Sequence, residues 1–292
     1  MTAKGRVNVQ LFGSFAICLD GVPKRLPLAG ATRALLLYLL CFPDRQVRRE
    51  FLIEQFWSSL KVERRFAALN SAVWRVRKAL VPFTGLDLEA TARTVTLHLA
   101  SDVTCDALLL AQATRCARST PCPDDAELES LAAALECSGA PLLEGMDDDW
   151  VLIERERMAT VHLRGLALMM RVLAEHRRYE DALEYGERIL AIDPFRESTI
   201  QEMMCLLLLA GQRVRALRLY QRSAKLLEDE LGITPMPETL ELYHYICSEP
   251  PEAAAQPPVR PRHQSGRNIG ERLSVIERSR LDLYRAISVQ PA

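Results

Sequence analysis

The first thirty residues alternate between apolar and polar side chains. The segments VNVQLF (7–12) and FAICL (15–19) have a period of two and flank a Gly-Ser dipeptide, which predicts two strands joined by a tight turn. An Asp-Gly dipeptide at 20–21 indicates a second turn, and KRLPL (24–28) follows it as a short third strand. The chain is therefore predicted to begin with a small antiparallel sheet.

The following residues change to helical periodicity and then return to alternation. Helices are predicted over 31–42, 48–57 and 64–80. The segments LDLEA (86–90) and TVTLHL (94–99) alternate around a Thr-Ala-Arg turn, which predicts a β-hairpin. Three strands, three helices and a closing hairpin are the order of a winged helix-turn-helix, in which the third helix reads DNA and the hairpin is the wing.

The third of these helices has two different faces. At about 100° per residue, its apolar side chains form one stripe of Leu69, Val73, Val76 and Leu80. The other side carries Asn70, Ser71, Trp74, Arg75 and Lys78, with Arg77 at the edge. A helix in a DNA major groove needs this arrangement, with apolar anchoring behind and hydrogen-bond donors in front. The same pattern fits a solvated surface helix, so the helix alone leaves both interpretations open.

From residue 106 onward the pattern is almost wholly helical. A repeat appears with an offset of 34 residues, which aligns Ala182 with Ala216 and Leu173 with Leu207. A helix–turn–helix period of 34 residues is typical of tetratricopeptide repeats, and two unrelated helix pairs are the alternative. The predicted fold class is mainly α with small β: an N-terminal winged helix-turn-helix followed by an α-helical tetratricopeptide-like domain.

These changes of pattern predict the domain boundaries. We expect a winged-helix domain over 1–105 and a helical domain over 106–248. The stretch 249–269 is rich in proline and is predicted to be an extended linker. The segment 270–292 is amphipathic and is predicted to form a helix, to which the sequence assigns no role.

The net charge of −1 conceals a difference between the two parts of the chain. Residues 1–105 carry 15 Lys and Arg against 8 Asp and Glu, a balance of +7. The remaining residues carry 22 against 30, a balance of −8. Because the positive part contains the two-faced helix, the asymmetry indicates that its partner is a polyanion such as double-stranded DNA.

The sequence shows few signs of other chemistry. We expect no signal peptide and no membrane partner, because no apolar run is long enough. No two of the eight cysteines form a C-x-x-C pair, which indicates neither a zinc site nor a redox motif, and most lie in apolar helical segments, so we expect a reducing cytoplasm. No Gly-rich phosphate loop or histidine metal motif occurs. The three acids at 147–149 stand at a predicted helix start, where they favour the positive end of the helix. We therefore expect no enzymatic activity, no cofactor and no metal.

The order of the motifs resembles a known family. The sequences LFGSF, ALLLYLL, VRREFLIEQFW and AALNSAVWRVRKAL resemble the DNA-binding half of the Streptomyces antibiotic regulatory protein (SARP) type activators. The helical half, which ends in AGQRVRALRLYQRSAKLLEDELGITPMPE, is similar to their bacterial transcriptional activator domain, and the resemblance covers about residues 7–245. It implies an OmpR-type winged helix that binds direct repeats near a promoter. It also implies a helical domain that assists self-association on DNA and contact with RNA polymerase.

The resemblance further implies which residues face DNA. It places the recognition helix on 66–80, with the polar face toward DNA. Arg49, at the start of the second helix, matches a basic position that could meet a phosphate across the groove. Arg93, in the wing turn, would enter the minor groove or contact the backbone. The candidate DNA-binding residues are Arg49, Asn70, Ser71, Trp74, Arg75, Arg77, Lys78 and Arg93.

Three positions depart from the family pattern. Arg48 stands where a helix-capping Ser or Thr is usual. The wing turn has Ala92-Arg93-Thr94 in place of a Gly-Tyr pair, and Trp74 faces outward where smaller or basic residues are common. The altered wing and Trp74 leave a second hypothesis open, in which the chain is a protein-interaction adaptor whose DNA binding is weakened or lost.

Overall fold

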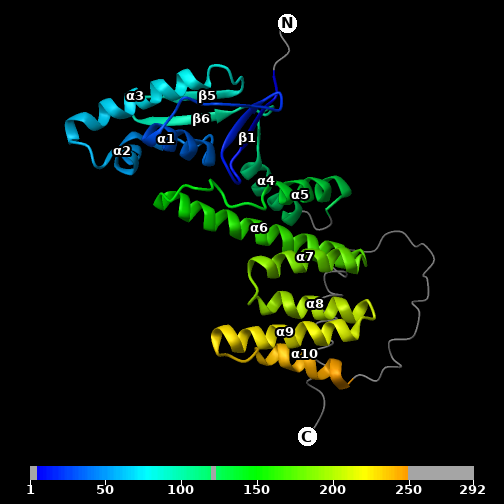
Figure 1. The fold of residues 1–292 in the computed structure, drawn as a ribbon. Coiled ribbons are helices and arrows are strands. Elements are labelled where there is room, and N and C mark those ends of the chain that lie inside the picture. The colour runs from blue at the N-terminus through cyan, green and yellow to red at the C-terminus, as the bar shows by residue number, and fades with distance from the viewer. Residues whose placement is uncertain (1–4, 120–122, 249–292) are drawn as a thin grey trace. The chain divides into compact units, whose positions relative to one another are not determined.

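The structure is a computed structural model that describes residues 5–119 and 123–248 (Figure 1). It is mainly α with small β, which confirms the predicted fold class. The predicted linker 249–269 and the predicted C-terminal helix 270–292 lie outside the described residues. In the part that the structure describes, every helix is too short or too polar to cross a membrane.

The chain begins with a four-stranded sheet in the order β3-β2-β1-β7. Its strands are β1 (Val7–Gln10), β2 (Ala16–Leu19), β3 (Val22–Lys24) and β7 (Thr104–Cys105). The first three pair antiparallel, and β7 pairs parallel to β1. The third strand lies earlier than the predicted 24–28, because pairing starts directly after the two-residue turn and Lys24 already faces Ile17, close to the start of β2.

Three helices form the core of this part of the chain. They are α1 (Gly30–Cys41), α2 (Arg49–Trp57) and α3 (Val62–Leu80). Helix α1 is apolar on nearly every side and its residues 34–41 are all buried, so it is the central helix on which the others pack. Helix α3 contacts α1, α2 and the wing strand β5.

A three-stranded sheet completes the winged helix-turn-helix. Its strands β4 (Val47–Arg48), β5 (Leu86–Ala90) and β6 (Thr94–Leu99) lie in the order β4-β6-β5, and both pairings are antiparallel. Strands β5 and β6 are the predicted hairpin, whereas β4 is too short to leave a period in the sequence. Because β4 leads directly into α2, its pairing with β6 fixes the start of α2 beside the turn of the hairpin.

The helical part begins with contacts to the winged helix. Its first helices are α4 (Asp106–Ser119), α5 (Asp125–Cys137) and α6 (Asp149–Glu175). The Asp106 carboxylate accepts hydrogen bonds from the backbone amides of Leu11 and Phe12, each at 2.9 Å. The ring of Trp150 lies edge-on to that of Tyr38 in α1, with centroids 5.2 Å apart. Residues on both sides of the predicted boundary therefore share one core.

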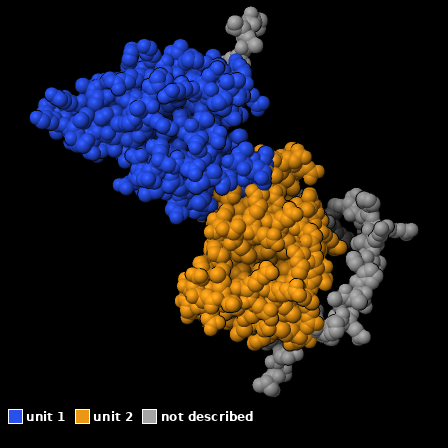
Figure 2. Space-filling view, in the orientation of Figure 1, with its two compact units in different colours: residues 1–113, 133–161 blue, residues 114–132, 162–292 orange. Residues whose placement is uncertain are grey.

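The chain divides into two compact units (Figure 2). Of the described residues, the first unit contains 5–113 and 133–161, and the second contains 114–119, 123–132 and 162–248. This division differs from the predicted one at residue 105. The physical reason is the packing of Asp106 and Trp150, because periodicity predicts where a helix begins but not which core it joins.

The second unit contains the repeat. Its helices after α6 are α7 (Tyr179–Ile192), α8 (Glu197–Leu209), α9 (Arg213–Leu231) and α10 (Pro237–Ser248), and each packs against the next (Figure 1). Ala182 in α7 and Ala216 in α9 are both fully buried, which agrees with the small positions of the 34-residue period. Gly186 in α7 meets α8 closely, since an added Cβ would lie 2.6 Å from the Sδ of Met203.

Candidate nucleic-acid interface

Helix α3 presents the two faces that its sequence predicts. On one face Leu69, Val76 and Leu80 are buried, with at most 3% of their surface exposed. The predicted contact residues of α3 are all exposed: Asn70, Ser71, Trp74, Arg75, Arg77 and Lys78. The core therefore holds the helix from behind and leaves a polar, cationic face open to a partner, which is the geometry of a helix that enters a major groove.

The middle of this face combines an aromatic ring with a cation. Trp74 is 60% exposed, and the Nζ of Lys78 lies 5.1 Å from the centroid of its indole ring. A cation over an indole face is attracted by the negative charge of the π electrons, so the two side chains form one ordered group. Such a group offers both apolar area and positive charge to whatever binds there.

Arg75 and Arg77 use their guanidinium groups differently. Within the described residues, Arg75 forms no hydrogen bond or ion pair, so its five donors remain for a phosphate or a base. Arg77 donates from Nε and Nη2 to the carbonyl oxygen of Leu88 in β5, at 3.3 and 2.9 Å. Arg77 therefore joins α3 to the wing sheet.

Arg49 lies behind the reading face, with only 9% of its surface exposed. Its Nη1 donates to the carbonyl oxygen of Thr91 in the wing turn at 2.8 Å, and its Nη2 donates to the Oδ1 of Asn70 on α3. Its backbone amide donates to the carbonyl oxygen of Arg93 at 3.0 Å. The side chain that the sequence predicts to contact a phosphate is thus bonded to two neighbours within the protein.

The wing turn is closed by Thr91, a residue that sequence reasoning missed. Its Oγ1 accepts hydrogen bonds from the backbone amides of Arg93 and Thr94 at 3.2 and 3.0 Å. Its own amide donates to the carbonyl oxygen of Thr94 at 2.9 Å. A threonine at the first position of a tight turn is the signal that could have indicated it. The turn leaves the Arg93 side chain exposed.

A histidine with two carboxylate partners braces the wing sheet. The Nδ1 of His98 in β6 lies 2.8 Å from the Oδ1 of Asp44, and its Nε2 lies 3.1 Å from the Oε2 of Glu89 in β5. The hydrogen bonds to Glu89 and Asp44 raise the pKa of His98 above its ordinary value of 6.5, because both favour the protonated ring. His98 thus joins the hairpin to the loop that follows α1.

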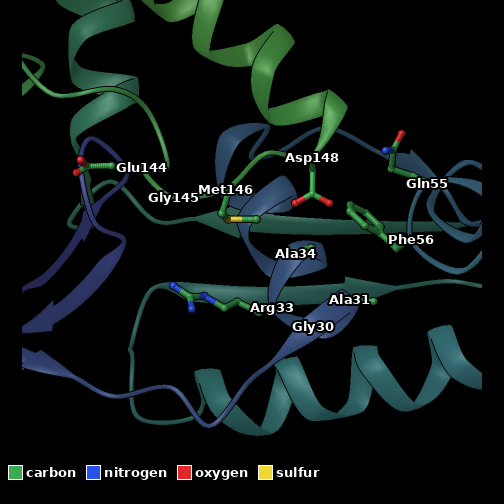
Figure 3. A pocket seen from close by; sticks show the side chains of 10 residues that line it. All are labelled: Gly30, Ala31, Arg33, Ala34, Gln55, Phe56, Glu144, Gly145, Met146 and Asp148. Atoms are coloured by element: carbon green, nitrogen blue, oxygen red, sulfur yellow. The ribbon is translucent and has the colours of Figure 1, made fainter.

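The first unit also contains a pocket of about 580 Å³, between the start of α1, the end of α2 and the loop before α6 (Figure 3). Its walls carry both signs of charge, with Arg33 from α1 and Glu144 and Asp148 from the loop. In the described ranges, no three His, Cys, Asp or Glu side chains are placed to hold a metal ion. The mixed charge of the pocket does not match a polyanion, whereas the exposed face of α3 does.

Comparisons with known proteins show which proteins the chain resembles. Residues 102–247 match the family model described as the bacterial transcriptional activator domain. The curated relatives include the regulatory protein AfsR of Streptomyces coelicolor, 27% identical over 224 residues, and that of Streptomyces griseus, 25% identical over 229 residues. Both alignments cover 76% of this chain but only 22% and 23% of those proteins, so the chain spans less than a quarter of their length.

A solved structure shares the fold. It is that of Mycobacterium tuberculosis EmbR in complex with a low-affinity phosphopeptide, which superposes with a TM-score of 0.70 at 23% sequence identity. The match covers 86% of this chain and 68% of that chain. The likeness therefore extends through most of the described residues and includes both compact units.

Proposed function

Because the chain belongs to the bacterial transcriptional activator domain family, we propose that it is a sequence-specific DNA-binding protein that activates transcription. The curated relatives are named regulatory proteins, and the motif order, the family match and the fold agree on a regulator of the SARP type. Our proposal concerns which bases the protein reads and how it activates transcription.

The exposed cationic face of α3 is the observation that carries the proposal. With α3 in the major groove, Arg75 would donate to guanine O6 and N7 or to a phosphate, and Lys78 would act as a point charge against the backbone. Trp74 would cover a sugar or a thymine methyl group. Arg93, exposed at the wing turn, would meet the neighbouring minor groove or a phosphate.

We also propose that protomers bind direct repeats near a promoter in head-to-tail order. A winged helix presents unlike surfaces at its two ends, so copies on repeated half-sites would meet through different faces. The repeat domain would assist this self-association and contact RNA polymerase, because helical arrays of this type offer extended surfaces to protein partners. The resemblance to SARP-type regulators supports these partners and a location in the cytoplasm on the nucleoid.

Removal of two exposed cations tests the reading face. The double variant Arg75→Ala, Lys78→Ala should lose DNA binding and keep its fold, because neither side chain is buried. The full-length protein first selects its site from a random duplex pool, and affinity for the selected duplex is then measured over a salt series. If a protomer neutralises about five phosphates, log K falls against log salt with a slope of about −4.5, and the variant's slope is shallower.

The matched control is Arg218→Ala, Arg222→Ala, which removes two exposed cations from α9 in the other compact unit. This variant should keep the wild-type affinity and slope. Enrichment of a direct repeat with about one helical turn between half-sites would support tandem binding. Unchanged affinity in the Arg75, Lys78 variant would overturn the assignment of α3 as the reading face.

The exposure of Trp74 favours one second candidate, an adaptor that binds a protein through this face or through its repeats. Exposed tryptophans are frequent anchors of protein interfaces, and the wing turn departs from the family pattern. In that case the protein would retain no duplex DNA, and a protein partner would stay bound as salt rises. The same salt series therefore separates the two functions.

A further inference from the structure

We propose that Arg49 is a positioning residue for base reading and not a phosphate ligand. It holds the amide of Asn70 and the wing turn in one geometry, so that Asn70 offers its Nδ2 donor to the base edge with two neighbouring acceptors, that of guanine. The inference rests on the proposed function, because it states what one residue of the same face would read.

Arg49 joins three elements at one point. It is the first residue of α2, its guanidinium reaches both α3 and the wing turn, and its backbone amide is bonded to the wing turn as well. Helix α3 and the wing turn are thus both bonded to the same side chain. A displacement of either one therefore breaks a hydrogen bond to Arg49, which ties their relative placement to the start of α2.

The burial of Arg49 argues against a phosphate contact. A buried guanidinium must keep its donors bonded, because an unpaired buried charge is very costly. Two of its nitrogens donate to oxygens of Thr91 and Asn70 within the protein. If the side chain turned outward to a phosphate, both oxygens would lose this donor. Arg75, which is exposed and has no such partners among the described residues, suits a phosphate far better.

The contact with Arg49 also orients the amide of Asn70. Arginine has only donors, so the atom of Asn70 that it meets must be Oδ1. The Nδ2 group is then the one that can donate outward. The usual two-bond contact of Asn with adenine requires Oδ1 to accept from adenine N6. With one of the two lone pairs of Oδ1 engaged by Arg49, donation from Nδ2 to guanine O6 or N7 is favoured over the paired contact with adenine.

Two substitutions at Arg49 separate positioning from phosphate binding. Arg49→Lys keeps the charge but loses the planar fork that spans two acceptors, and Arg49→Gln removes the charge. The matched control is Arg48→Lys, because Arg48 is the neighbouring residue and is exposed. All proteins are full length, and their thermal midpoints are compared first so that only folded variants are used.

Affinity is measured on two probes, a duplex of random sequence and the duplex that the wild type selects. We expect both Arg49 variants to keep the affinity for random duplex and the salt slope, since no phosphate contact is lost. Affinity for the selected duplex should fall about tenfold, and the preference for a G·C pair at one position should relax. The Arg48→Lys control should change neither.

A second measurement tests, without DNA, whether Arg49 holds the wing turn in place. Hydrogen exchange of the Arg93 and Thr94 amides in the wing turn should accelerate at least tenfold in Arg49→Lys and stay at the wild-type rate in Arg48→Lys. This result would show that Arg49 acts by fixing the position of the wing turn.

Three outcomes would overturn the proposal. The first is full affinity of Arg49→Lys for the selected duplex, together with a slope about 0.9 shallower in Arg49→Gln, as a lost phosphate contact predicts. The second is unchanged exchange in the wing turn, and the third is selection of an A·T pair at the position whose readout depends on Asn70. A wild-type protein that binds no duplex would instead remove the proposed function, and with it the base reading assigned to Asn70.

Discussion

The three arginines around α3 show how burial decides what a guanidinium group can do. Arg75 is exposed to solvent and forms no hydrogen bond or ion pair within the described residues, so all its donors remain for a ligand. Arg77 is exposed but is already bonded to Leu88 of the wing sheet, and Arg49 is buried and bonded on two sides. The same side chain thus acts as ligand, tether or internal brace according to what surrounds it.

His98 makes the stability of the wing depend on pH. Its pKa in the folded chain lies above the ordinary value of 6.5, so the protonated ring adds stability that is complete below the unfolded pKa. This stability is lost as pH rises through the folded pKa. We expect the urea midpoint of the wild type to fall between about pH 6 and pH 8, and that of His98→Gln to change less. The effect should be small, because His98 and both carboxylates are largely exposed.

The double variant Asp44→Asn, Glu89→Gln is the control for this titration. It keeps His98 but removes both negative charges that raise its pKa, so it should behave like His98→Gln. An equal pH dependence in the wild type and in His98→Gln would mean that another group titrates in this range.

The sequence predicts residue positions better than residue roles. The exposed face of α3 could be predicted, because the side of a helix on which a residue lies follows from spacing alone. The internal role of Arg49 could not, since it depends on Asn70, 21 residues later, and on Thr91, 42 residues later. Hydrogen bonds between elements leave no period in the sequence.

At the scale of elements, some helices and strands follow from the local sequence pattern, whereas others form only by pairing with a distant strand. Helices α2 and α3 and the hairpin β5–β6 follow from periodicity, and α1 follows from an apolar run that is longer than a strand. Strands β4 and β7 have two residues each and exist only through their partners β6 and β1. Such strands could not be predicted from the chain alone, although β4 is what places α2 beside the wing.

Close packing between α7 and α8 depends on Gly186. We expect Gly186→Ala to lower the free energy of unfolding by about 1 kcal/mol. Crowding against the side chains of Met203 and Met170 costs about 1–3 kcal/mol, and the higher helix propensity of alanine returns about 1 kcal/mol. Urea unfolding of the two proteins measures the difference.

The same substitution in a Met203→Ala background is the control. The smaller side chain leaves room for the added methyl group, so the double variant should lose less than the sum of the two single losses. If the two losses of unfolding free energy simply add, the side chain of Met203 is not what crowds the added methyl group.

At the scale of the whole molecule, the winged helix depends on residues that follow it in the chain. Asp106 accepts the amides of Leu11 and Phe12, and Trp150 packs against Tyr38. The family match from residue 102 and the helical pattern from 106 both suggest an earlier boundary. The shared core could not be predicted from the sequence, because contacts between residues far apart in the chain leave no pattern in it. The bonds of the Asp106 carboxylate and the packing of Trp150 on Tyr38 are contacts of this kind.

Fragments of the chain test this dependence. We expect 1–105 to unfold at a lower urea concentration than 1–161, with a loss of about 3 kcal/mol or more. Two buried amides without acceptors cost about 1–3 kcal/mol each, and the burial of the tryptophan is lost as well. Equal stability of the two fragments would contradict a shared core.

The variant Asp106→Ala, Trp150→Ala in fragment 1–161 provides the control for this comparison. It removes both contacts without shortening the chain, so it should reproduce most of the loss seen in 1–105.

The exposure of Trp74 has a consequence for the tryptophan fluorescence of the protein. The chain has three tryptophans, and Trp57 and Trp150 are buried with 8% and 7% of their surface exposed, whereas Trp74 is 60% exposed. The longest-wavelength fluorescence therefore comes from the one indole on the reading face. A base or sugar that covers this ring would shift or quench that emission, and the two buried indoles would remain as an internal reference. The protein carries its own optical reporter at the surface proposed to meet DNA.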